Sequence, residues 1–134
     1  MSRTLMLFVF LSVVGCSGTL KYTVPSSSKA PGADAKLVAD VKNDQNQTQL
    51  EFHVENLAPA DRVADGATGY VAWYRKNSST AWTRFGSIKY DAGSLKGELV
   101  ASAPETSFDF EVSAEKDISS ASPSSDIVFS QHVN

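Results

Sequence analysis

The sequence predicts an all-β fold, a single β-sandwich of about seven short antiparallel strands. From Lys36 onward, apolar residues recur at every second position far more often than at every third or fourth, as in strands with one buried face. Clusters of Asn, Asp, Gly, Ser and Pro separate these alternating segments at regular intervals. This part of the chain, about 100 residues long, is enough for one hydrophobic core and too short for two domains.

The first two strands are predicted at residues 36–42 and 50–54. In both, apolar residues alternate with polar ones, and the polar run at 43–47 supplies a turn, so the two strands form a hairpin. A loop at 56–69 leads to a third strand at 70–75. This strand carries apolar side chains on both faces, which indicates a central position in its sheet.

Four further strands complete the predicted sandwich. They are expected at residues 81–88, 94–100, 108–115 and 127–130. Turns at 77–79 and 91–93 precede the first two of them, and a serine-rich loop at 119–125 precedes the last. The acidic row Asp109, Glu111 and Glu115 is expected to form a solvated face, balanced across the strands by Arg75 and Lys76. 

The order of these segments is similar to that of immunoglobulin-like domains of the fibronectin type III kind. Residues 49–54, 69–75 and 108–114 look like strands B, C and F of such a domain, and the serine-rich loop with Pro123 also fits. A weaker similarity is to the extracytoplasmic domain of anti-sigma factors of the RskA type, through the strand Tyr70 to Trp73. Both resemblances imply a fold and bring no catalytic residues with them, and sigma-factor regulation is not implied.

The N-terminal segment is typical of a secretory signal. Arg3 precedes an apolar run at 5–14, which is too short to span a bilayer because a transmembrane helix needs roughly 20 apolar residues. The run ends in Val13-Val14 and is followed by Gly15 and Cys16. The segment Val13-Val14-Gly15-Cys16 resembles the lipobox of bacterial lipoproteins. The resemblance implies that residues 1–15 are cleaved off and that Cys16 is acylated, with palmitate-type chains.

Acylation of Cys16 implies a partner and a location. Two or more acyl chains anchor a protein stably where one is marginal, so membrane lipid is the expected partner of Cys16. The alternative is an incidental residue near the cleavage site of a secreted protein, but Cys16 is the only cysteine and would then be a free thiol. Ser17 after the anchor favours the outer membrane under the sorting rule of enteric lipoproteins. The domain is then expected in the periplasm or at the cell surface.

Residues 16–35 leave two interpretations open. Their Ser, Gly and Pro content is typical of a flexible tether, whose root-mean-square reach would be about 20–25 Å. The alternation of Leu20, Tyr22 and Val24 equally favours a short edge strand at 20–24. In either case the sandwich domain is expected at 36–134.

Composition and motifs exclude several functions. The net charge is −3, and it becomes −4 without residues 1–15, so the chain offers no basic field for nucleic acid. His53 and His132 are too few for a metal or proton-transfer cluster and are expected to be surface imidazoles. No Gly-x-Ser-x-Gly motif occurs. The sequence therefore predicts no catalytic residue, metal site or cofactor.

Aromatic residues supply the one binding hypothesis. If Val71 and Trp73 face the core, Tyr70 and Tyr74 lie on the outer face, where they can hold a sugar ring or a partner protein. Trp82 is expected to be exposed in the neighbouring hairpin. The expected function is a non-catalytic binding or structural module for an envelope protein or glycan. The alternative is an envelope enzyme, or an accessory subunit of one, whose site has no recognisable motif.

Overall fold

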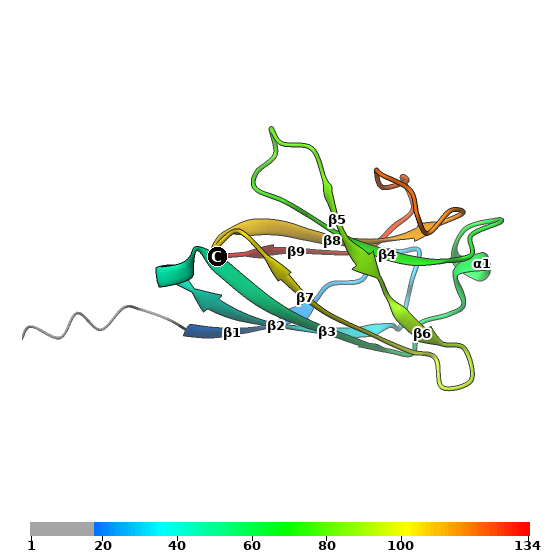
Figure 1. Ribbon diagram of the computed structural model, residues 1–134. Coiled ribbons are helices and arrows are strands. Elements are labelled where there is room, and N and C mark those ends of the chain that lie inside the picture. The colour runs from blue at the N-terminus through cyan, green and yellow to red at the C-terminus, as the bar shows by residue number, and fades with distance from the viewer. Residues whose placement is uncertain (1–17) are drawn as a thin grey trace, which may run out of the picture.

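The computed structural model describes residues 18–134, which form two antiparallel sheets packed face to face (Figure 1). One sheet has five strands in the order β1-β2-β3-β7-β6, and the other has four in the order β5-β4-β8-β9. The strands are β1 Gly18–Val24, β2 Asp34–Lys42, β3 Gln47–Glu55, β4 Gly69–Arg75, β5 Thr83–Ser87, β6 Lys89–Asp91, β7 Lys96–Ala103, β8 Phe108–Glu115 and β9 Ile127–Val133. Two short helices, η1 Asn43–Gln45 and α1 Ala60–Val63, lie in connections. The predicted all-β sandwich is confirmed, with nine strands in place of about seven.

The strand order is that of an immunoglobulin-like sandwich. The strands β2-β3-β7-β6 follow the order ABED, and β5-β4-β8-β9 follow the order C′CFG. The chain crosses from one sheet to the other between β5 and β6, at the buried Ile88. As predicted, β2 and β3 form a hairpin, and β4 is an inner strand buried on both faces.

The strand β1 is added outside β2, at the edge of the five-stranded sheet. It pairs with β2 along its whole length, from Gly18 opposite Val41 to Val24 opposite Ala35. Of the two interpretations of this segment, the edge strand is therefore the observed one. The tether interpretation does not hold for residues 18–24.

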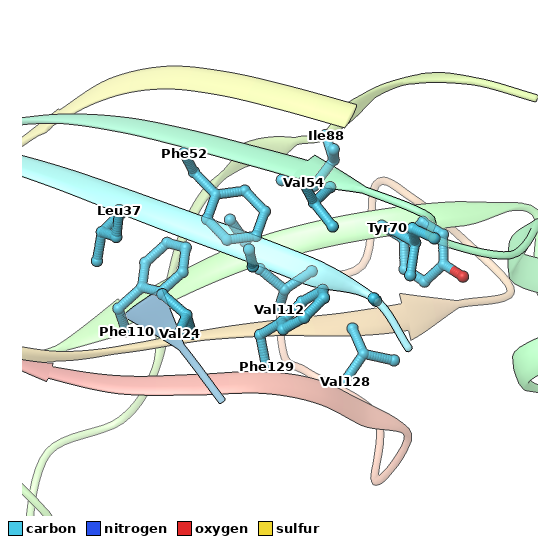
Figure 2. Close-up of a cluster of buried hydrophobic side chains, with 14 of the residues drawn as sticks. Val24, Leu37, Phe52, Val54, Tyr70, Ile88, Phe110, Val112, Val128 and Phe129 are labelled. Atoms are coloured by element: carbon cyan, nitrogen blue, oxygen red, sulfur yellow. The ribbon is translucent and has the colours of Figure 1, made fainter. Parts of the chain in front are cut away.

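The hydrophobic core lies between the two sheets (Figure 2). Phe52 on β3 lies 5.3 Å from Phe110 on β8 and 5.6 Å from Phe129 on β9, measured between ring centroids. Val54 and Val112 extend this cluster from the same two sheets. Burying each such side chain stabilises the fold by roughly 1.5–3 kcal/mol. With Cys16 as its only cysteine, the chain has no internal disulfide to add to this.

The two ends of the sandwich differ in what they carry. The start of β1, η1 and the end of β9 lie at one end, and α1 with the β6–β7 turn lies at the other (Figure 1). Within residues 18–134, the structure has no helix with the length and apolar character needed to cross a membrane. Cys16 and the lipobox-like segment before it lie outside the described residues.

Candidate functional site

The strand β4 turns Val71 and Trp73 to the outer face of the four-stranded sheet, and it turns Tyr70 and Ala72 into the core. The arrangement in which Val71 and Trp73 face the core is therefore wrong. Trp73 nevertheless has an exposed fraction of 0%. Both faces of β4 are buried because another part of the chain covers the outer face as well.

Part of the outer face is covered by the connection between β8 and β9, residues 116–126. The side chain of Ile118 packs over Gly69, where an added Cβ would lie 2.7 Å from its Cγ2 atom. Arg84 on β5 donates a hydrogen bond to the backbone carbonyl of Ile118 at 2.6 Å. The hydroxyl of Ser124 donates to the carbonyl of Ala114 at 2.8 Å. These contacts hold the serine-rich loop against the sheet.

A buried polar network lies beneath this loop. The indole Nε1 of Trp73 donates to the hydroxyl of Ser113 at 2.8 Å, and Ser113 donates to Glu115 Oε1 at 2.6 Å. The backbone N–H of Ser124 donates to the same carboxylate oxygen at 2.7 Å. Glu115 is only 4% exposed, and these two hydrogen bonds replace the water that its carboxylate loses.

The two tyrosines of the binding hypothesis belong to the core side of β4. Tyr70 is 1% exposed, and its hydroxyl donates to the backbone carbonyl of Ala58 at 2.6 Å. Burial raises the pKa of Tyr70 far above its ordinary value, so the phenol stays neutral. The half-buried ring of Tyr74 lies 4.5 Å from that of Phe85. Neither tyrosine forms an outer aromatic row, and of the three proposed surface residues only Trp82 borders the outer face.

The uncovered part of the outer face holds a shallow hollow with a volume of about 280 Å³. It opens between β8, β9 and the β4–β5 connection, in the half of the sheet where β8 begins and β9 ends. The residues that line it are Arg75, Trp82, Asp109, Phe110, Glu111, Ser130, Gln131 and His132. This hollow is the candidate functional site.

A chain of charged contacts forms one wall of the hollow. Arg75 Nε lies 2.9 Å from Asp109 Oδ2, and His132 Nδ1 lies 2.8 Å from Asp109 Oδ1. The guanidinium carbon of Arg75 lies 4.4 Å from the ring centroid of Trp82, a cation–π contact. The hydrogen bond from His132, followed by that from Arg75, lowers the pKa of Asp109 below its ordinary value. Both oxygens of Asp109 are therefore occupied by basic side chains.

Glu111 lies two residues further along the same face of β8 and has a different environment. Its exposed fraction is 8%, and it takes part in no hydrogen bond or salt bridge within residues 18–134. Burial raises the pKa of Glu111 to about 7, with a further rise from the charges of Asp109 and Glu115 and an opposing effect of Arg75. Neighbouring carboxyls with pKa values displaced in opposite directions mark a candidate functional site.

The expectation of a solvated acidic row is only partly met. Arg75 pairs with Asp109 across the strands as expected, but Glu111 and Glu115 are buried. Sequence reasoning missed the role of Glu111 because alternation with core residues was taken to imply exposure. A usable signal was the outward Trp73, since a tryptophan on the polar face indicates that something covers that face.

Of the two histidines, His132 lines the hollow and His53 lies on the other sheet. His53 is exposed on the outer face of the five-stranded sheet, and the side chain of His132 is 55% exposed, so both are surface imidazoles as predicted. In the part of the chain that the structure describes, no group of three His, Cys, Asp or Glu side chains is arranged to hold a metal ion. No protein-family model, curated protein or solved structure matches the chain.

Proposed function

We propose that the protein is a lipid-anchored module of the bacterial cell envelope. In this proposal, residues 1–15 are a cleaved signal peptide and acylated Cys16 attaches a non-catalytic binding or structural sandwich to a membrane, by preference the outer one. The observation that carries the proposal is the lipobox-like segment Val13-Val14-Gly15-Cys16. The folded domain begins almost immediately after it, with β1 at Gly18.

The position of β1 supports a close apposition of domain and membrane. Ser17 alone separates Cys16 from Gly18, and an extended chain spans at most about 3.6 Å per residue. The first residue of β1 would therefore lie within about 7 Å of the lipidated cysteine, in place of a tether reaching about 20–25 Å. The end of the sandwich that carries η1 would then face the lipid surface.

The loops at that end support attachment by the acyl chains and not by charge. Residues 43–46 and 104–107 carry Asp44 and Glu105, and the cations nearest to them at this end are two separate lysines, Lys42 before η1 and Lys76 after β4. Binding of a polybasic segment to anionic lipid depends on Lys and Arg, each worth about 1 kcal/mol near the surface. Two separate lysines beside two carboxylates form no polybasic segment, so the anchor would supply the affinity.

A binding role is favoured over catalysis by the geometry of the hollow. Asp109 is hydrogen-bonded to His132 as a carboxylate that orients a general base would be. Ser130, two residues before His132, is the hydroxyl of the same hollow, but no hydrogen bond joins the two side chains. Nucleophilic catalysis needs that contact to activate the hydroxyl. The hollow has the polar and aromatic lining of a recognition surface.

The anchor is tested by comparing the full chain with a Cys16→Ala variant, with Ser17→Ala as the matched control. We expect the full chain and Ser17→Ala in the membrane fraction, unmoved by a wash in 1 M salt, and Cys16→Ala in the soluble fraction. Mass spectrometry should find acyl mass on the N-terminal Cys16 of the first two proteins. A Cys16→Ala variant that remains in the membrane, or a mature form without acyl mass, would overturn the proposal.

A further inference from the structure

We propose that the hollow between β8, β9 and the β4–β5 connection binds a primary ammonium group on an aliphatic arm, as in a lysine side chain. Glu111 accepts the ammonium, and Trp82 lines the arm. The inference deepens the proposed binding role and rests on it for the assumption that this hollow is the binding face.

The pairing of charges within the hollow identifies Glu111 as the acceptor. Arg75 and His132 both pair with Asp109, one on each carboxylate oxygen. Glu111 is left. The residue is only 8% exposed, and its carboxyl lines the hollow, reaches solvent there and has no hydrogen-bonding partner among residues 18–134. A carboxylate with so little access to water is stabilised in its ionised form by an opposite charge or by hydrogen-bond donors, and a bound ammonium provides both.

The same pairing argues against other ligand classes. An anion would meet Glu111 without gaining a free cation, because Arg75 and His132 are already paired with Asp109. A metal ion needs several oxygen or nitrogen ligands, and no such group is arranged in the described part of the chain. One free carboxyl suits one ammonium, whose three N–H donors can also bond a neutral acceptor such as the hydroxyl of Ser130, the β9 residue opposite Glu111.

The lining of the hollow suits an aliphatic arm. The half-buried indole of Trp82 holds the Arg75 guanidinium on its ring at 4.4 Å and gives the hollow an apolar wall. The volume of about 280 Å³ exceeds the share of a few water molecules, each of which occupies roughly 30 Å³. An alkyl chain can displace that water against the indole while its charged end reaches the carboxyl of Glu111.

The test is a titration of the ¹⁵N-labelled full chain, recovered from membranes in detergent micelles, with Nα-acetyl-lysine methylamide. The chain has two tryptophans, so two indole N–H signals report on it. We expect the Trp82 signal and the amides around Glu111 and His132 to shift, while the signal of buried Trp73 stays in place. The norleucine analogue and the Nε-acetylated lysine analogue, which lack the charge, should shift neither signal.

The carboxyl is tested by Glu111→Gln, with Glu98→Gln on the exposed face of the other sheet as the matched control. We expect at least a tenfold loss of affinity in Glu111→Gln and none in Glu98→Gln. Because the ammonium competes with the proton on Glu111, wild-type affinity should rise about tenfold from pH 6 to pH 8. Unchanged amide dispersion in the spectrum of Glu111→Gln shows that the variant is folded, and the two uncharged analogues test the wild-type protein independently of it.

Three results would each overturn the ammonium site: an absence of shifts with the lysine probe, equal shifts with the norleucine analogue, or undiminished binding by Glu111→Gln. Mass spectrometry of the same micellar sample tests the lipid anchor separately from ammonium binding. A missing acyl mass with intact binding would contradict the membrane attachment only. An intact anchor without binding would contradict the ammonium site only.

Discussion

The indole of Trp73 donates its N–H to the hydroxyl of Ser113 on the neighbouring strand, 40 residues away in the sequence, at 2.8 Å. Val71 is the β4 residue opposite Ser113, so the indole reaches diagonally across the pair of strands. This contact lets a tryptophan lie on the outer face of a sheet and still be fully buried, because its only polar atom is satisfied. Ser113 passes the interaction on to the buried carboxylate of Glu115.

Ser113→Ala should therefore destabilise the fold more than an ordinary loss of a serine hydroxyl. The variant leaves the Trp73 N–H without its acceptor and removes one of the two donors to Glu115, at a cost of about 1–3 kcal/mol. Ser102→Ala, at an exposed position of β7, is the control and should stay within about 0.5 kcal/mol of wild type. Urea unfolding measures both, and equal free energies of unfolding for the two variants would contradict the network.

Glu111 should make the stability of the protein decrease as the pH rises. Its pKa of about 7 in the folded state exceeds the ordinary value of 4.5, so the folded state binds the proton more tightly than the unfolded state. Its stabilising contribution is thus complete below pH 4.5 and is lost as the pH rises through about 7.

The Glu111→Gln variant removes this titration. Relative to wild type, its free energy of unfolding should gain roughly 2–3 kcal/mol between pH 5 and pH 8, since one pKa unit corresponds to about 1.4 kcal/mol. The exposed Glu98→Gln should show no such gain. Urea denaturation at the two pH values measures the difference. A constant difference between wild type and Glu111→Gln would show that Glu111 titrates normally.

The hydroxyls of the two β4 tyrosines should contribute differently to the stability of the fold, although both rings pack on the core. Tyr70→Phe leaves the carbonyl of Ala58 without its donor, which should cost about 1 kcal/mol. Tyr74 makes no side-chain hydrogen bond within residues 18–134, so Tyr74→Phe should be nearly neutral. Thermal or chemical unfolding separates the two variants. A larger loss in Tyr74→Phe would mean that the facing of β4 is misassigned.

Strands with one polar face were predictable from the sequence because period-2 alternation fixes both the strand and its buried side. In β3, Phe52 and Val54 alternate with Glu51 and His53, and the structure buries the first pair and exposes the second. The strand β4 has apolar residues on both faces. Its sequence therefore identifies a strand but does not say which face is turned into the core. In the structure the core-side Tyr70 hydroxyl is satisfied by the carbonyl of Ala58, a contact with the 56–60 connection that alternation does not predict.

The candidate site was harder to predict for a related reason. Its central pair follows from strand register, because Arg75 on β4 lies directly opposite Asp109 on β8. Alternation fixes faces within a strand but not the register between two strands joined by long connections. Burial of Glu111 depends in addition on side chains from β9 and from the β4–β5 connection, which come together only in the folded sheet.

Gly97 should tolerate no side chain, because the core closes directly over it. A Cβ at this position would lie 2.8 Å from Ile88 Cγ2 and 3.0 Å from Val54 Cγ1, both buried and packed between the sheets. Gly97→Ala should therefore lower the free energy of unfolding by roughly 1–3 kcal/mol, the cost of overpacking a filled core.

Gly18→Ala is the matched control in the edge strand β1, where no atom lies within 4 Å of the added Cβ. Because glycine is unfavourable within a strand, that variant should be at least as stable as wild type. Urea unfolding of the two variants compares the sites, and equal stabilities would mean that the two sheets pack less closely at Gly97 than these distances require.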